Sequence, residues 1–100
     1  MSKGLTFNQV KESHFKTLEQ YVPIVDRVHG ANHPEFHEVR RVFDVLIKKT
    51  KAARTGKPKL NEEFAKLREI TNNYTVPSDV CESYEAVYTM LAEADKSYQS

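Results

Sequence analysis

The chain has 100 residues, of which 39% are hydrophobic and 29% are charged, and its formal net charge is +1. These values are typical of one soluble globular domain over residues 1–100, and they exclude a disordered or collagen-like chain. No apolar run approaches the roughly 20 residues of a membrane-spanning helix, and the N-terminal residues lack the apolar core of a secretory signal. Cys81 is the only cysteine, so no intrachain disulfide is expected. We therefore expect a cytoplasmic protein without a membrane partner.

The first amphipathic pattern predicts a helix that ends near Gly30. Its apolar face, which also carries His14, repeats at steps of three or four residues: Phe7, Val10, Leu18, Tyr21, Val25 and Val28. Pro23 cannot bond to the Glu19 carbonyl, so we expect a kink or a restart of the helix there. Gly30 is expected in the left-handed conformation that closes a helix.

The residues after Gly30 predict a turn into a second helix, from Asn32 to about residue 53. Asn32 and Glu35 have the spacing of a capping box, and Pro34 would lie in the first turn. The apolar face of this helix holds Phe36, Val39, Phe43, Leu46 and Ile47. Residues 54–58 contain both Gly and Pro, which predicts a loop after it.

Two more helices follow in the second half of the chain. Asn61 is expected as the N-cap of the third helix, and Asn72 and Asn73 as its end. The fourth is expected to begin near residues 75–77, with Pro77 in its first turn. The inward positions are Phe64, Leu67, Ile70 or Thr71, and Tyr74 in the third helix, and Val80, Tyr84, Val87, Leu91 and Ala94 in the fourth. Because no strand pattern accompanies these helices, the sequence predicts an all-α, up-and-down bundle of four helices.

The basic residues cluster between positions 48 and 59. This segment holds six basic and no acidic residues, whereas residues 60–100 hold eight acidic and three basic ones. The segment can be interpreted structurally, as a solvated linker, or functionally, as a phosphate-binding patch. No aromatic side chain interleaves with these lysines, so a stacking platform for single-stranded nucleic acid is absent and nucleic acid is not the expected partner. Neutralising Lys48, Lys49 and Lys51 would test the nucleic-acid alternative.

Four histidines are the candidate metal ligands. His29, His33 and His37 are spaced like one helical face, but the turn at Gly30 separates His29 from the other two. His33 and His37 could share a face of the second helix and clamp an ion; alternatively His37 faces solvent. His14 lies about 22 Å from His29 along a straight helix, so the two cannot bind one ion within a chain. His14 is expected to be buried or half-buried with a local partner.

Cys81 has two interpretations. A buried packing cysteine on the inner side of the fourth helix is the plainer one. A reactive thiolate would need nearby positive charge, and the neighbouring Asp79 and Glu82 oppose it. No Ser/His/Asp order, GxSxG elbow or glycine-rich phosphate loop is present, so no motif argues for an enzyme.

Two motifs resemble the hemerythrin-like domain of iron–sulfur cluster repair proteins, the repair-of-iron-centres (RIC) family. The first is RVHGANHPE at residues 27–35, and the second is LREITNNYTVP at residues 67–77, followed by DVC at 79–81. They occur in the family's order, and the resemblance spans residues 18–95. It implies a cytoplasmic helical bundle with a non-haem di-iron centre, which acts in cluster repair after oxidative or nitrosative damage.

The iron ligands of that family carry over only in part. His29 matches a family ligand, whereas the upstream family histidine would fall near Asn8 and a further one, before Phe64, is missing. The family's helix with a His-x-x-x-Glu pair is shortened into residues 48–59, and the chain stops at Ser100, before the last helix delivers its His and Glu. Two interpretations stay open: a reduced relative without the di-iron site, or a site rebuilt between two copies.

The resemblance implies a small accessory protein of cluster repair or iron handling. Iron would be its cofactor, held around His29, His33, His37 and Glu35. Its partners would be iron–sulfur proteins, a full-length RIC protein, or a second copy of the chain. The alternative is a non-catalytic helical interaction module, such as a homodimer, that has lost the di-iron site.

Overall fold

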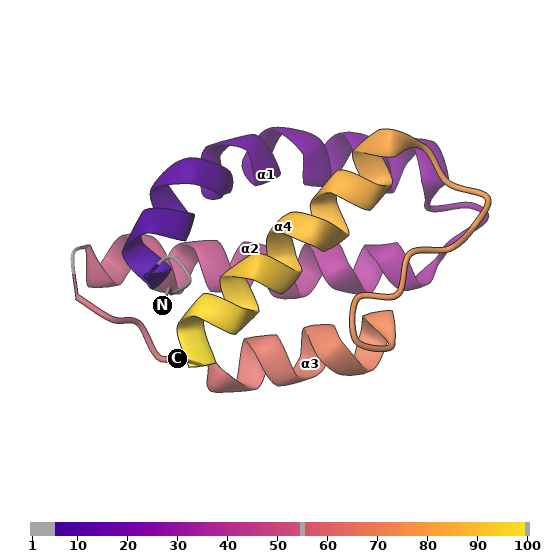
Figure 1. The fold of residues 1–100 in the computed structure, drawn as a ribbon. Helices are drawn as coiled ribbons and strands as arrows, with labels where there is room; N and C mark the ends of the chain where they lie inside the picture. The colour runs from indigo at the N-terminus through magenta and orange to yellow at the C-terminus, as the bar shows by residue number, and fades with distance from the viewer. Residues whose placement is uncertain (1–5, 55, 100) are drawn as a thin grey trace.

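The computed structural model describes residues 6–54 and 56–99, and these residues form four helices and no strand (Figure 1). The helices are α1 (Phe7–His29), α2 (Glu35–Ala53), α3 (Asn61–Thr71) and α4 (Glu82–Gln99). The predicted all-α class and the number of helices are confirmed. None of the described helices is long and apolar enough to cross a membrane. The loop predicted at residues 54–58 includes Thr55, which lies outside the described residues.

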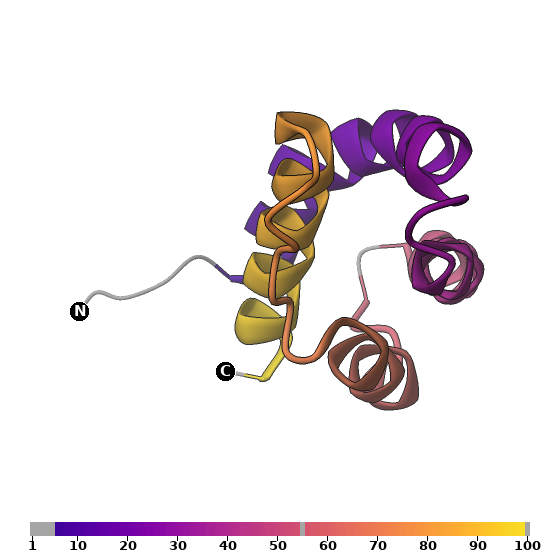
Figure 2. The same cartoon turned by 90° about the vertical axis from the view of Figure 1, so that its right-hand side faces the viewer.

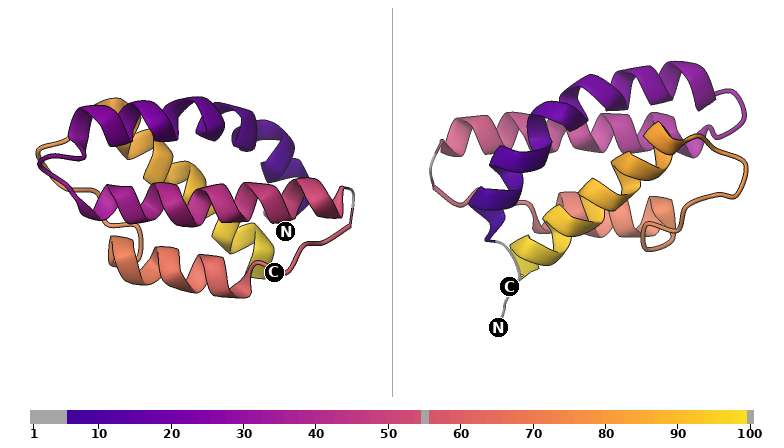
Figure 3. Two further views of the ribbon diagram at one scale, coloured as in Figure 1. Left: turned by 180° about the vertical axis from the view of Figure 1, so that it is seen from behind. Right: turned by 45° about the horizontal axis from the view of Figure 1, so that its top comes forward.

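The helices follow one another around the bundle in chain order. Seen nearly end-on, α1, α2 and α3 form an arc, and α4 lies on its open side (Figure 2). Neighbours in the chain run in opposite directions, which is the up-and-down order, but α4 crosses the others diagonally (Figures 1 and 3). Each helix therefore turns one face toward the enclosed core, as the spacing of apolar residues requires.

Aromatic side chains dominate the core that these faces enclose. The largest side chains with less than 2% exposure include Phe36, Phe64, Tyr84 and Tyr88. Phe36 and Tyr88 stack with ring centroids 6.2 Å apart, which joins α2 to α4. Full burial of a side chain of this size stabilises the fold by about 1.5–3 kcal/mol. The amphipathic faces predicted from the sequence are largely the faces that are buried, but the inward position predicted for Val28, at the end of α1, is wrong, because this side chain is 60% exposed.

α1 is one helix despite its internal proline. Pro23 neither ends nor restarts it, and the ribbon is curved along its length rather than divided (Figure 3). The helix begins at a capping box. The backbone N–H of Gln9 donates to the Thr6 hydroxyl at 3.2 Å, and the backbone N–H of Thr6 donates to the side-chain oxygen of Gln9 at 2.9 Å. The buried Val22 and Val25 on either side of Pro23 hold the helix against the core.

The capping box predicted at Asn32 and Glu35 is wrong. α2 begins at Glu35 after Pro34, and no side chain caps it. The Glu35 carboxylate lies 3.1 Å from Nδ1 of His33 instead, so it serves the histidine and not the backbone amide of Asn32. Asn61 is likewise the first residue of α3 and not its N-cap, which is Leu60.

The fourth helix begins later than predicted. α3 ends as expected at Asn72, which is left-handed with φ 53°, but Asn73 and Tyr74 are left-handed as well. The hydroxyl of Tyr74 donates to Asp95 at 2.8 Å, which fixes this end of α3 beside α4. Residues 75–81 are therefore needed to carry the chain to the far start of the diagonal α4, and Pro77 lies in this connection rather than in a helix (Figure 1).

Gly30 follows α1 in a right-handed conformation, with φ −59°, so the predicted left-handed cap is wrong. Glycine is required there by close packing. A Cβ at this position would lie 2.4 Å from the Asp26 carbonyl oxygen and 2.5 Å from Cε1 of His37. The backbone at Gly30 thus lies so close to the His37 ring that a residue with a side chain would not fit there.

Replacing Gly30 by Ala is expected to lower the free energy of unfolding by about 1–3 kcal/mol, the usual cost of forcing extra atoms into a packed site. Urea denaturation monitored by circular dichroism measures it. Gly56→Ala is the matched control, because its Cβ would meet only the Ala53 carbonyl, at 3.2 Å. Equal losses in both variants, or none at Gly30, would contradict the close packing of His37.

Candidate functional site

Two connections meet at one end of the bundle. The α1–α2 turn and the α3–α4 connection lie side by side there, at the right of Figure 1. They bring together six side chains, which we call the histidine corner: His29, His33, Glu35, Asp79, Cys81 and Tyr84. Residues separated by about fifty positions in the sequence therefore share one site.

His29 and Cys81 form the first contact of the histidine corner. Nε2 of His29 lies 3.1 Å from Sγ of Cys81. His29 is the last residue of α1 and is half-buried, while Cys81 immediately precedes α4 and is exposed. The prediction of a buried packing cysteine is wrong, because the late start of α4 leaves Cys81 in the connection rather than on an inner helical face.

His33 forms the second contact. Its Nε2 lies 3.0 Å from Oδ1 of Asp79, and its Nδ1 lies 3.1 Å from Oε2 of Glu35. The His33 side chain is 14% exposed, whereas Asp79 is 66% exposed. A neutral imidazole donates from only one ring nitrogen, so both contacts are hydrogen bonds only when His33 carries its second proton. The His33 side chain thereby joins the α1–α2 turn to the α3–α4 connection.

The buried ring of Tyr84 contacts both histidines of the histidine corner. The rings of His29 and His33 each lie 5.5 Å from the Tyr84 ring, in edge-on arrangements. Tyr84 is fully buried, and its hydroxyl is 3.0 Å from that of Tyr88. Burial, followed by this hydrogen bond, raises the pKa of Tyr84 far above its ordinary value. Both imidazole rings therefore pack against the same buried aromatic ring.

Three buried tyrosines are expected to resist ionisation until the protein unfolds. Burial is the main cause that raises the pKa of Tyr74, Tyr84 and Tyr88 above that of a free tyrosine. The unfolded chain loses these protons near pH 10 while the folded one keeps them, so stability falls as the pH rises above about 10. The tyrosinate absorbance of these three residues should therefore appear together with the loss of helical circular dichroism at alkaline pH. Reversible ionisation of every tyrosine near pH 10 with the helices intact would contradict this burial.

The other two histidines join helices outside the histidine corner. Nδ1 of His37 lies 2.5 Å from Oδ1 of the buried Asp26, whose other oxygen accepts from Arg40 at 3.1 Å. His37 is 54% exposed, in keeping with the interpretation that it faces solvent. His14 is half-buried, but its partner is not local: Nε2 lies 2.6 Å from Oε1 of Glu93 on α4.

The predicted ligands are thus placed in separate contacts. His33 and Glu35 are neighbours, His29 faces Cys81, and His37 faces Asp26. Within residues 6–54 and 56–99, no group of three or more His, Cys, Asp or Glu side chains is arranged to hold a metal ion. The donors that do meet, imidazole nitrogen with thiol or carboxylate, are those that bind zinc and iron.

The basic segment at residues 48–59 supplies ion pairs and caps. Lys49 lies 3.0 Å from the carboxylate of Glu63, and Lys51 lies 3.1 Å from that of Glu19. Lys57 donates to the carbonyl oxygen of Tyr98 at 3.1 Å, and its ammonium is 4.6 Å from the centre of that ring. These contacts favour the structural interpretation of the segment over a phosphate-binding patch.

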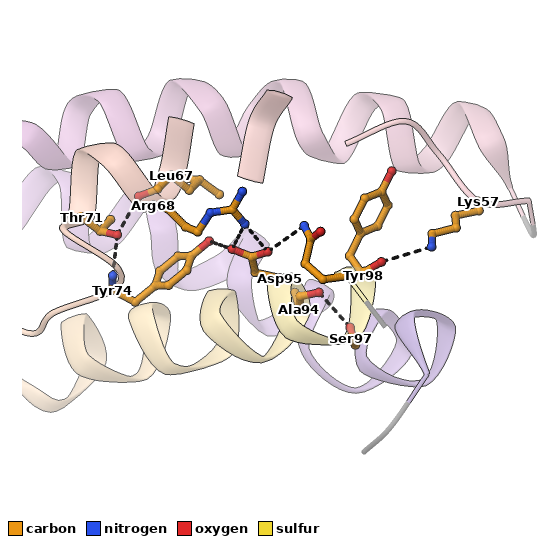
Figure 4. Close-up of polar contacts among 10 residues, drawn as sticks. Lys57, Leu67, Arg68, Thr71, Tyr74, Ala94, Asp95, Ser97 and Tyr98 are labelled. Atoms are coloured by element: carbon orange, nitrogen blue, oxygen red, sulfur yellow. Dashed lines mark hydrogen bonds and ion pairs between the residues drawn. The ribbon is translucent and has the colours of Figure 1, made fainter. Parts of the chain in front are cut away.

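A second polar cluster, which the sequence did not predict, closes the seam between α3 and α4. Both carboxylate oxygens of the buried Asp95 accept from Nη1 of Arg68, at 2.7 and 2.8 Å (Figure 4). Tyr74 donates to the same carboxylate at 2.8 Å, and Gln99 donates at 3.2 Å. The carboxylate is therefore fully engaged by its own chain, which indicates a structural role.

Comparisons with protein-family models, with curated proteins and with solved structures find no match to this chain.

Proposed function

We propose that this protein is a small accessory of iron–sulfur cluster repair or iron handling, which acts through the histidine corner. The observation that supports it is the position of His29. This residue lies in the first RIC-like motif, and its partner Cys81 lies directly after the second motif, 3.1 Å away. The two stretches that resemble the family are therefore the two that build the site.

The chemistry of the histidine corner suits transient handling of iron. Imidazole, thiol and carboxylate groups are all iron ligands, and the five side chains of these kinds in the histidine corner are exposed or half-buried. Exposed ligands allow an ion to enter and leave. The acidic Asp79 and Glu35 add negative charge that attracts a cation.

Reactivation of a damaged enzyme tests this function. A hydratase whose [4Fe–4S] cluster has been oxidised would be incubated anaerobically with ferrous iron, a reductant and the protein. We expect faster recovery of activity with the wild type than with His29→Ala, while His14→Gln, which alters a histidine far from the corner, behaves as the wild type. Equal recovery with and without the protein would overturn the proposal.

A helical interaction module is the second candidate, because some apolar side chains remain uncovered. Ile24, Val28 and Val45 are 47%, 60% and 41% exposed. A module of this kind would bind its partner through such residues and would need no metal. Partner binding that is lost in Val28→Asp but retained in His29→Ala would favour it over iron handling.

A further inference from the structure

We propose that His29 and Cys81 are half of a tetrahedral site for a soft divalent ion such as Zn²⁺, and that the same two residues of a second copy complete it. Four-coordinate zinc takes two His and two Cys ligands in many structural sites. One copy brings one imidazole and one thiol together, so two copies supply the full set. This site uses His29 and Cys81 of the histidine corner, as the proposed iron function does, but it concerns a different ion and requires a second chain.

The distance between the two donor atoms fits coordination. With Zn–S about 2.3 Å and Zn–N about 2.0–2.1 Å at tetrahedral angles, the nitrogen and sulfur lie about 3.5 Å apart. Nε2 of His29 and Sγ of Cys81 are 3.1 Å apart. A side-chain adjustment of a few tenths of an ångström therefore admits the ion, because Cys81 is exposed and lies in a connection rather than in a helix.

The surrounding charge favours a cation over a free thiolate. Asp79 and Glu82 flank Cys81 and are exposed, and no Lys or Arg occurs between Arg68 and Lys96. A free thiolate needs positive neighbours to be stable, which this stretch does not provide. A bound divalent ion supplies that positive charge itself and is attracted by the two carboxylates.

The surface beside His29 suits a second copy of the chain. Val28, the residue before it, is 60% exposed, and Ile24, one turn earlier on α1, is 47% exposed. Pairing two copies at His29 would bring these apolar side chains to the contact and remove them from water. The ion fixes the geometry, and the apolar residues add affinity.

Binding releases protons in a defined number. Each Cys81 thiol loses its proton to solvent as the sulfur bonds to the ion, and each His29 binds as the neutral imidazole through Nε2. One Zn²⁺ therefore displaces two thiol protons per pair of chains when His29 starts neutral. The site then carries no net charge from its four ligands and ion, since two thiolates balance one divalent cation.

Zinc titration with mass measurement tests the site. The untagged full chain, kept reduced with a phosphine, would be titrated with Zn²⁺ and examined by light scattering and metal analysis. We expect one ion per two chains and a doubling of mass on binding. Replacing Zn²⁺ by Co²⁺ should give a thiolate-to-cobalt absorption band, which reports the Cys81 bond directly.

Variants separate the site from general effects on folding. Cys81→Ser and His29→Gln should weaken zinc binding by at least about tenfold and stay monomeric with Zn²⁺, while keeping the helical content of the wild type. His14→Gln should dimerise normally. One ion per monomer, a metal-independent dimer, or binding unchanged in Cys81→Ser would each overturn the proposal. Because the iron function is judged by cluster reactivation, its failure would leave these results unaffected.

Discussion

Replacing Asp95 by Asn is expected to lower the free energy of unfolding by about 3 kcal/mol. The carboxylate is buried and accepts from Arg68, Tyr74 and Gln99. Removing one partner of a buried pair costs about 3–5 kcal/mol, and we expect the lower end because Arg68 is 38% exposed and regains part of its hydration. Chemical denaturation monitored by circular dichroism measures the loss.

The exposed Asp44 on α2 offers a matched control for this experiment. Asp44→Asn makes the same chemical change on the surface and should shift stability by less than about 0.5 kcal/mol. Tyr74→Phe removes one hydrogen bond to the carboxylate and should cost about 1.5–3 kcal/mol. If Asp95→Asn and Asp44→Asn proved equally stable, the cluster between α3 and α4 would not hold the two helices together.

Replacing Tyr84 by Ala is expected to cost about 3–5 kcal/mol, as for other large buried aromatic residues. The ring is fully buried and contacts Phe36 with centroids 5.0 Å apart. It also lies under both His29 and His33, so the same change should loosen the histidine corner. Denaturation gives the stability, and the NMR chemical shifts of the two imidazoles report the loss of the ring beside them.

Tyr84→Phe separates the ring from the hydroxyl. It keeps the aromatic ring that contacts the histidines but leaves the Tyr88 hydroxyl without its hydrogen-bond partner. This loss should lower the free energy of unfolding by about 1–3 kcal/mol. The imidazole shifts of His29 and His33 should stay close to those of the wild type. Loss of these shifts in Tyr84→Phe, or their retention in Tyr84→Ala, would show that another group positions the histidines.

The helices were predictable because apolar spacing governs burial. The faces that contain Val10, Leu18, Phe36 and Phe64 recur at helical steps, and all four side chains are buried. Helix ends were less predictable, since they depend on contacts between distant residues. Gly30 is right-handed, and what requires glycine there is the close approach of the His37 ring, a contact that no local rule describes.

The candidate site was only partly predictable. His29 and His33 stand out in the sequence as a pair around a turn. Cys81 and Asp79 do not, because they reach the histidines only when the connection between α3 and α4 crosses the end of the bundle. The signal that was available is the second RIC-like stretch, which ends just before Asp79 and Cys81. The contacts of Asp79 and Cys81 with the histidines could not be predicted, because about fifty residues separate the partners in the sequence.

Metal analysis after anaerobic loading with ferrous iron tests the central claim most directly. The protein would be purified without a histidine tag, loaded, freed of unbound iron and measured by mass spectrometry for metals, alongside His29→Ala and His14→Gln. The iron-handling function predicts near-stoichiometric iron in the wild type and in His14→Gln, and its loss in His29→Ala. No retained iron in the wild type, or equal iron in all three proteins, would contradict a role for the histidine corner in iron chemistry.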